Sequence, residues 1–222
     1  MKILMLVISG GECPIYKNNR ELLRTNTHPL VTTRFIEYSQ SVSKITLIED
    51  TLLLPGTESF KTITDKTIDS IEYFLSDTSF THVIRSNLSS VWHFPRLIAY
   101  LETRETTELF TGAIGNEGYG SFISGAGMYM SRDVAELLIK CKNAACRYPY
   151  QDDVAISYAL RDVGVNITLS QNRIDLLTPE LFHTNKYSIA DTIHHFRLKQ
   201  EDDRSLEPMF MKELIKLFPK MI

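Results

Sequence analysis

The sequence predicts an α/β fold in which a mostly parallel central sheet is flanked by helices. Residues 3–8 form a continuous apolar run that ends at Gly10 and Gly11, which is typical of a strand buried on both faces of a parallel sheet. Further along the chain, short apolar segments alternate with segments whose apolar residues recur at helical spacing. Such alternation favours helices packed on a single sheet.

The expected elements follow the chain in order. Helical spacing indicates helices at residues 17–23, 57–75, 94–101, 132–140, 152–162 and 205–218. Strands are expected at residues 3–8, 44–49, 81–85, 110–114, 121–130 and 166–169, and residues 33–39 are either extended or helical. Ser131 suits a helix N-cap and Gly164 a helix end. We expect one domain over residues 1–222, with the C-terminal helix packed on it.

Composition excludes several classes of protein. The 222 residues carry a formal net charge of −3, and their cations are scattered. Nucleic acid is therefore not an expected partner, because binding to phosphate backbones needs clustered Lys and Arg. The first apolar run is too short to span a membrane, no other run approaches that length, and no cleavage site follows it. We expect a cytoplasmic protein, in the host cytoplasm if the source is a virus. Cys13, Cys141 and Cys146 fit neither a zinc site nor a disulfide framework.

Common phosphate-binding and nucleophile motifs are missing. No glycine-rich stretch ends in Gly-Lys-Ser/Thr, and no Gly-x-Gly-x-x-Gly follows the first strand. No Gly-x-Ser-x-Gly elbow is present either, which disfavours a hydrolase. Ligands in α/β folds bind beyond the carboxyl ends of the strands. Residues 9–11 and the polar turn expected at residues 86–90 both lie at such ends, which predicts one shared cleft.

The stretch Ser-Gly-Ala-Gly-Met-Tyr-Met-Ser at residues 124–131 is the first of three unusual segments. Its small residues permit the close approach of a ligand to the backbone. Taken alone, a tight turn explains it equally well.

The second segment, residues 150–156, places Asp152 and Asp153 at the start of an apolar helix. Paired carboxylates can do acid–base chemistry. Taken alone, acidic residues favoured by the helix dipole explain them better.

The third segment, residues 193–199, reads Ile-His-His-Phe-Arg-Leu-Lys. If it is extended, His195, Arg197 and Lys199 share one face and could neutralise a diphosphate. Taken alone, a solvated edge strand is the simpler interpretation.

Together these segments resemble the fringe-like β-1,3-glycosyltransferases. Residues 58–68 are similar to the family segment Asp-Ser-Tyr-x-Asn-Leu-Thr-x-Lys-Thr, and residues 124–131 are similar to its Ser-Gly-Ala-Gly-Tyr-x-x-Ser. Residues 152–154 resemble its Glu-Asp-Val, and residues 81–87 fall where the family has a strand that runs into an acidic metal motif. Order and spacing hold over residues 44–160. The C-terminal His-x-Arg-x-Lys is similar to the ends of microbial and viral relatives.

The resemblance implies a GT-A fold and an inverting transfer from a nucleotide-diphosphate sugar, most often UDP-linked, to a hydroxyl of a glycan acceptor. By position, Asp153 is the catalytic base, and Asp152 orients it or binds the acceptor. The donor-binding residues that it implies are Ser9 and Gly10 for the nucleotide, Lys66 for positioning, and Gly125, Ala126 and Gly127 along the sugar.

The sequence departs from the family at the metal motif, where Arg85-Ser86-Asn87 replaces an acidic triplet. A departing diphosphate still needs compensating charge. A divalent cation (Mn or Mg) could bind through other groups, with His194 one candidate ligand by position. Alternatively, Arg85, Arg197 and Lys199 could supply the charge, with Ser86 and Asn87 also in the donor site. We favour the cation slightly, because the diphosphate brings most of its oxygen ligands.

Two alternatives come from other functional classes. A catalytically inactive module that binds a sugar or nucleotide on the same fold would explain the lost acidic triplet. The retained Asp152 and Asp153 disfavour it, since a binding module needs no base there. A nucleotidyltransferase would need acidic metal ligands that the sequence does not offer.

Overall fold

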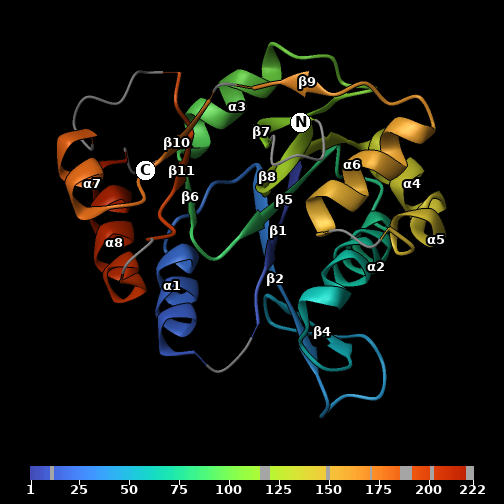
Figure 1. Ribbon diagram of the computed structural model, residues 1–222, viewed down its shortest axis with the longest axis horizontal. Helices are drawn as coiled ribbons and strands as arrows, with labels where there is room; N and C mark the ends of the chain where they lie inside the picture. Colours follow the sequence, from blue (N-terminus) through green and yellow to red (C-terminus); the bar gives the residue numbers. More distant parts are fainter. Residues whose placement is uncertain are drawn as a thin grey trace.

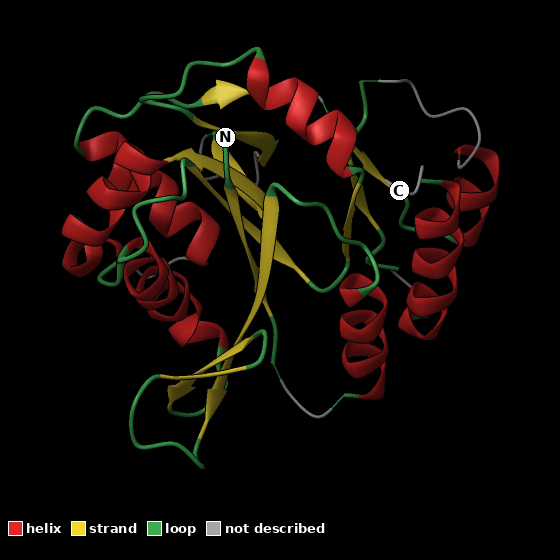
Figure 2. Ribbon diagram, turned by 180° about the vertical axis from the view of Figure 1, so that it is seen from behind, coloured by secondary structure: helices red, strands yellow, loops and turns green. Residues whose placement is uncertain are grey.

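The fold of the chain combines a central twisted sheet, helices on both of its faces, and a smaller second sheet at one side (Figure 1). The computed structural model describes residues 1–10, 13–115, 121–148, 151–170, 172–185, 192–200 and 203–218. Figure 2 shows the helices in two groups, one on each side of the sheet. The predicted α/β fold, with a central sheet flanked by helices, is confirmed. No helix in the described ranges is both long and apolar enough to cross a membrane.

The strands are β1 (Ile3–Ile8), β2 (Val31–Ser39), β3 (Thr46–Ile48), β4 (Thr51–Pro55), β5 (His82–Asn87), β6 (Ser90–Trp92), β7 (Phe110–Gly115), β8 (Phe122–Ser131), β9 (Thr168–Leu169), β10 (Arg173–Asp175) and β11 (His195–Arg197). The helices are α1 (Pro14–Arg24), α2 (Ile63–Leu75), α3 (Phe94–Glu102), α4 (Arg132–Lys140), α5 (Lys142–Ala145), α6 (Asp152–Asp162), α7 (Pro179–Asn185) and α8 (Glu207–Leu217), with short 3₁₀ turns at Phe60–Thr62 and Arg204–Leu206.

The main sheet brings two strand ends together. Within the described residues its order is β3-β4-β2-β1-β5-β8-β7-β9. Strands β4, β2, β1 and β5 run parallel, whereas β8 runs antiparallel to both of its neighbours. The register pairs Ile8 at the end of β1 with Asn87 at the end of β5. The carboxyl ends of these central strands therefore meet at one edge, as the sequence predicted.

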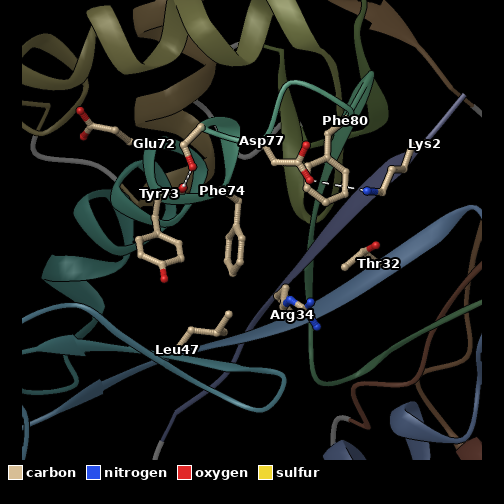
Figure 3. Close-up of a pocket in the computed structure, with 10 residues that line it drawn as sticks. Lys2, Thr32, Arg34, Leu47, Glu72, Tyr73, Phe74, Asp77 and Phe80 are labelled. Atoms are coloured by element: carbon tan, nitrogen blue, oxygen red, sulfur yellow. Dashed lines mark hydrogen bonds and ion pairs between the residues drawn. The ribbon is translucent and has the colours of Figure 1, made fainter.

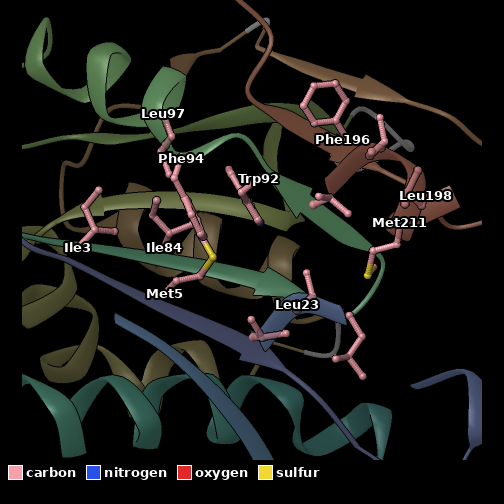
Figure 4. Close-up of a cluster of buried hydrophobic side chains, with 14 of the residues drawn as sticks. Ile3, Met5, Leu23, Ile84, Trp92, Phe94, Leu97, Phe196, Leu198 and Met211 are labelled. Atoms are coloured by element: carbon pink, nitrogen blue, oxygen red, sulfur yellow. The ribbon is translucent and has the colours of Figure 1, made fainter. Parts of the chain in front are cut away.

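Both faces of β1 are buried, which explains its continuous apolar run. Met5 and Val7 join a cluster that contains Trp92 and residues of α3 and α8 (Figure 4). Leu4 and Leu6 join a second cluster on the opposite face, with residues of α2, α4 and α6. Truncation of such a fully buried side chain to alanine typically destabilises a protein by about 2–5 kcal/mol.

The second sheet has the order β10-β11-β6 and ties the C-terminal part of the chain to the main sheet. Phe196 and Leu198 lie in the same apolar cluster as Phe210 and Met211 of α8. Buried Glu207 at the start of α8 accepts a hydrogen bond from the Ser89 hydroxyl at 2.9 Å. The C-terminal helix thus packs on the core through both apolar and polar contacts.

Several sequence predictions need correction in detail. The helix predicted at residues 57–75 begins as a regular helix only at Ile63, because Phe60–Thr62 is a 3₁₀ turn. The polar turn expected at residues 86–90 is shorter, since Ser86 and Asn87 end β5 and Ser90 opens β6. Strands β4, β6 and β10 and helices α5 and α7 were not predicted, because short segments carry little periodicity. Residues 33–39 are extended, and antiparallel β8 makes the sheet mixed.

Candidate active site

The candidate site lies at the edge where β1, β5 and β8 meet the start of α6. The Ser124–Gly127 stretch of β8 interrupts the ladder with β7 there. Gly112 of β7 pairs with Met128 of β8, and Ile114 pairs with Ile123. One residue of β7 therefore lies opposite four residues of β8, which form a bulge. A Cβ atom on Gly125 would lie 2.6 Å from the Arg85 guanidinium, on the side of α6. The bulge thus needs small residues, because it is buried and closely packed.

The opposite side of the bulge faces the second sheet. A Cβ atom on Gly127 would lie 2.6 Å from the His195 ring and 2.9 Å from the Trp92 ring. The His195 and Trp92 rings are stacked at 4.0 Å between centroids. The Ala126 carbonyl accepts a hydrogen bond from the Ser90 hydroxyl at 3.1 Å. The predicted sugar-lining segment therefore runs between α6 on one side and the second sheet on the other.

Asp152 and Asp153 open α6 in different environments. The Asp152 carboxylate accepts a 2.6 Å hydrogen bond from buried Arg85. Burial raises the pKa of Asp152, and the Arg85 charge opposes that rise. Asp153 instead accepts backbone N–H groups, at 3.1 Å from Gly125 and 3.0 Å from Val154. Asp152 is fixed by a cation, whereas Asp153 is oriented by backbone amides.

Lys66 lies beneath the end of β1. It is 1% exposed, and its ammonium donates to Glu58 at 2.6 Å and 2.7 Å and to the Ser9 carbonyl. Burial lowers the pKa of Lys66 despite the Glu58 partner. The Glu58 carboxylate also approaches Gly10 so closely that a Cβ atom there would lie 2.6 Å away. Lys66 and Glu58 therefore fix the position of Ser9 and Gly10, the predicted nucleotide-binding segment.

The remaining donor-site predictions at the strand ends have structural partners. The Ser9 hydroxyl donates to Glu37 at 2.6 Å, and Glu37 also pairs with Arg20. The Ser86 hydroxyl accepts from the Trp92 indole N–H at 2.8 Å. The Asn87 side chain accepts from the Ser89 amide and the Ser90 hydroxyl, which closes the turn between β5 and β6.

These partners decide how well a divalent cation fits. At the position of the family's acidic triplet, Arg85 is a cation and the Ser86 and Asn87 oxygens already accept hydrogen bonds. His194 is fully buried, and its Nε2 atom lies 2.9 Å from the Tyr129 hydroxyl. Burial lowers the pKa of His194 to about 3. No group of three His, Cys, Asp or Glu side chains in the described part of the chain is arranged to hold a metal. The described residues therefore do not fit the predicted Mn or Mg site.

The segment at residues 193–199 places one predicted residue, Arg197, in the second sheet and another, Lys199, on the surface. Arg197 pairs in register with Ser90 and is partly exposed, whereas Lys199 is exposed beyond the end of β11. His195 is buried, so the row of three cations expected from the sequence does not form. The sequence analysis missed Arg173, which lies two residues before Asp175 on β10 and shares a face with Arg197. The alternation Arg-x-Asp was its only signal.

A hollow of about 640 Å³ lies elsewhere, at the opposite end of the main sheet (Figure 3). Lys2 before β1, Arg34 in β2, and Phe74 and Asp77 at the end of α2 line it. None of the residues predicted for the site contributes to it. We place the candidate active site at the other edge, where the carboxylates and the glycine segment converge. Catalysis requires such reactive groups, and the residues that line the hollow do not include these carboxylates or these glycines.

Comparison with known proteins identifies the fold. No family model and no curated protein matches the sequence. Among solved structures, the chain is similar to one described as "Crystal structure of a glycosyltransferase involved in the glycosylation of the major capsid of PBCV-1". The TM-score is 0.58 at 10% sequence identity, and the match covers 96% of this chain and 100% of that one.

The chain has a GT-A-like fold. The match spans almost the whole chain and includes both of its sheets. At this identity it concerns the fold alone, so the narrower resemblance to fringe-like β-1,3-glycosyltransferases stays a prediction.

Proposed function

We propose that the protein is an inverting glycosyltransferase that moves a sugar from a nucleotide-diphosphate donor, with UDP-linked sugars the first candidates, to a hydroxyl of a glycan. One observation carries the proposal. Two adjacent carboxylates open α6 beside a glycine bulge, and among the described residues only Asp152 is paired with a cation. Asp153 is held by the Gly125 amide and points along the segment that would line the sugar.

The proposed reaction follows from that arrangement. Asp153 accepts the proton of the acceptor hydroxyl while the hydroxyl oxygen forms a bond to the anomeric carbon. The bond from that carbon to the phosphate oxygen breaks, and the nucleoside diphosphate leaves with the electron pair. Asp152 keeps Arg85 in place and so fixes the wall beside Gly125.

The donor would lie across the strand ends. Ser9 and Gly10, held by Glu37, Glu58 and Lys66, would take the nucleotide, since they follow the central strand of the sheet. Gly125, Ala126 and Gly127 would line the sugar, as their place in the Ser-Gly-Ala-Gly segment implies. A catalytically inactive binding module on the same fold remains the second candidate, favoured by the Arg-Ser-Asn sequence at the metal position.

A donor screen tests the proposal. The protein is incubated with a panel of nucleotide-diphosphate sugars and simple glycan acceptors, and release of nucleoside diphosphate is measured with and without manganese. We expect release from one donor, and proton NMR of the product should show the anomeric configuration opposite to that of the donor. A donor that raises the melting temperature but is never turned over would favour the binding module. No turnover together with no thermal stabilisation by any donor would contradict both candidates.

A further inference from the structure

The leaving diphosphate of the proposed reaction needs positive charge that the strand-end residues do not provide. Arg85, which like Asp153 lies against Gly125, is already paired with Asp152, and Lys66 is paired with Glu58. The described residues do not fit a divalent cation at the family's metal position. We infer that the guanidinium groups of Arg173 and Arg197 bind the diphosphate instead. This inference rests on the proposed function.

Arg173 and Arg197 share one carboxylate. On the second sheet, Asp175 pairs in register with Arg197, and Arg173 lies on the same face two residues before Asp175. Arg173 approaches both oxygens of Asp175, with Nε at 2.6 Å from Oδ1 and Nη2 at 3.0 Å from Oδ2. Arg197 reaches the same carboxylate only at 3.7 Å. Two guanidinium groups thus face a single acid, which leaves an excess of positive charge.

The hydrogen bonds of this cluster are incomplete. Within the described residues, Nη1 of Arg173 and Nε of Arg197 are buried atoms without a hydrogen-bond partner. Burial lowers the pKa of Arg173, and the neighbouring Arg197 charge adds to the effect. Unpaired buried donors raise the free energy of the folded protein. An anion that accepts from both guanidinium groups would relieve this, and phosphate oxygens match the planar geometry of arginine.

The cluster lies on the correct side of the bulge for a leaving group. Arg197 pairs in register with Ser90, whose hydroxyl contacts the Ala126 carbonyl. His195, on the same face as Arg197, touches Gly127. Asp153 and Arg85 lie against Gly125 on the other side. Inversion requires the nucleophile and the leaving group on opposite faces of the anomeric carbon, and this arrangement places a base on one side of the bulge and the two arginines on the other.

The neighbouring groups do not provide the same charge. His195 is buried next to Arg173 and Arg197, and burial together with those two charges holds its pKa well below the usual range, so its ring is neutral. Lys199 is exposed at the end of β11. Among the described residues, Arg85 also has a buried donor without a partner, its Nε atom, but Arg85 has a carboxylate of its own, whereas Arg173 and Arg197 share one.

The test measures nucleotide binding rather than turnover. Binding of UDP, UMP and uridine is followed by calorimetry in EDTA and in manganese, with GDP, ADP and TDP alongside. We expect the wild type to bind one nucleoside diphosphate in EDTA, with an affinity that manganese changes less than about threefold. Arg197→Gln should weaken that binding about 10- to 100-fold, as the loss of a charged hydrogen bond predicts, and should leave nucleoside binding unchanged. Arg104→Gln, at an exposed arginine after α3, is the matched control.

Arg173→Gln should show the same loss. Since Arg173 is 13% exposed and its change could impair folding, Arg173→Lys serves as a second variant, and it should retain part of the affinity. Diphosphate binding that requires manganese and survives the arginine substitutions would overturn the inference while leaving a nucleotide site in place. No binding of any nucleotide or nucleotide sugar, with or without manganese, would overturn the proposed function and this inference with it.

Discussion

The two sides of the Ser124–Gly127 bulge differ in how many carboxylates are paired with their cations. On the α6 side, Arg85 pairs with Asp152 and Lys66 pairs with Glu58, so each buried cation has its own carboxylate. On the side of the second sheet, Arg173 and Arg197 share Asp175, so two cations have one carboxylate between them. A saturated side is suited to hold backbone and base in position, whereas an unsaturated side is suited to receive an anion. Under the proposed function, this difference would compensate the charge of a diphosphate without the acidic triplet.

Removal of Arg85 is expected to give the largest effect. Arg85→Met leaves the Asp152 carboxylate buried without a cation, which should lower the free energy of unfolding by about 3–5 kcal/mol in chemical denaturation. The folded protein would then hold the Asp152 proton to higher pH than the unfolded chain does. Stability of the variant should therefore fall more steeply than that of the wild type as the pH rises from about 4 toward neutrality.

The double variant Arg85→Met/Asp152→Asn is the control for that experiment. It removes both charges and should recover much of the lost stability, since no buried ion remains unpaired. Equal destabilisation in the single and double variants would show that Arg85 acts through packing and not through its charge.

Gly127→Ala should also destabilise the protein, because the added methyl group meets the buried rings of His195 and Trp92. Overpacking of this kind typically costs about 1–3 kcal/mol, and donor turnover should be lost as well. Gly164→Ala is the matched comparison. Gly164 has a φ of +90°, and a Cβ atom added there would meet nothing within 4 Å, so only a backbone penalty of about 1 kcal/mol is expected, with turnover intact.

The free energy of unfolding at acidic pH should depend on the titration of His194. Burial lowers its folded pKa to about 3, against an ordinary value of 6.5, so the unfolded chain takes up the proton first. Stability should fall as the pH drops below 6.5, and His194 should contribute about 2 kcal/mol of that loss between pH 7 and pH 5. His194→Gln should flatten the limb by that amount. An unchanged slope would mean that the pKa of His194 is the same in the folded and unfolded states. His194 could then carry a charge beside the second sheet, in addition to the arginines.

The smallest effect on stability is expected at Arg197. Its side chain is 27% exposed and lies 3.7 Å from Asp175, so Arg197→Gln should change the free energy of unfolding by less than about 1 kcal/mol. A loss as large as that of Arg85→Met would mean that the two sides of the bulge are equally saturated, and the comparison would fail.

The sequence predicted the parts of the fold that have strong periodicity. The apolar run of β1 and the helical spacing of α4 and α6 appear at their expected places. It also predicted that Ser9 and Asn87 lie at one edge, because parallel strands end together. The second sheet was not predictable, since three-residue strands show no period and their pairing links segments far apart in the chain. The pairing of Arg85 with Asp152 and the position of Arg173 likewise depend on contacts between segments far apart in the chain.

The most direct test of the central claim compares two aspartates that open helices. Asp133 in the first turn of α4 accepts the Glu108 amide at 2.8 Å, much as Asp153 accepts the Gly125 amide, but it lies after the far end of β8. Nucleoside-diphosphate release at saturating donor is measured for the wild type, Asp153→Asn and Asp133→Asn. The account predicts a loss of about 10²- to 10⁴-fold in Asp153→Asn and wild-type rates in Asp133→Asn. Wild-type release by Asp153→Asn would contradict it.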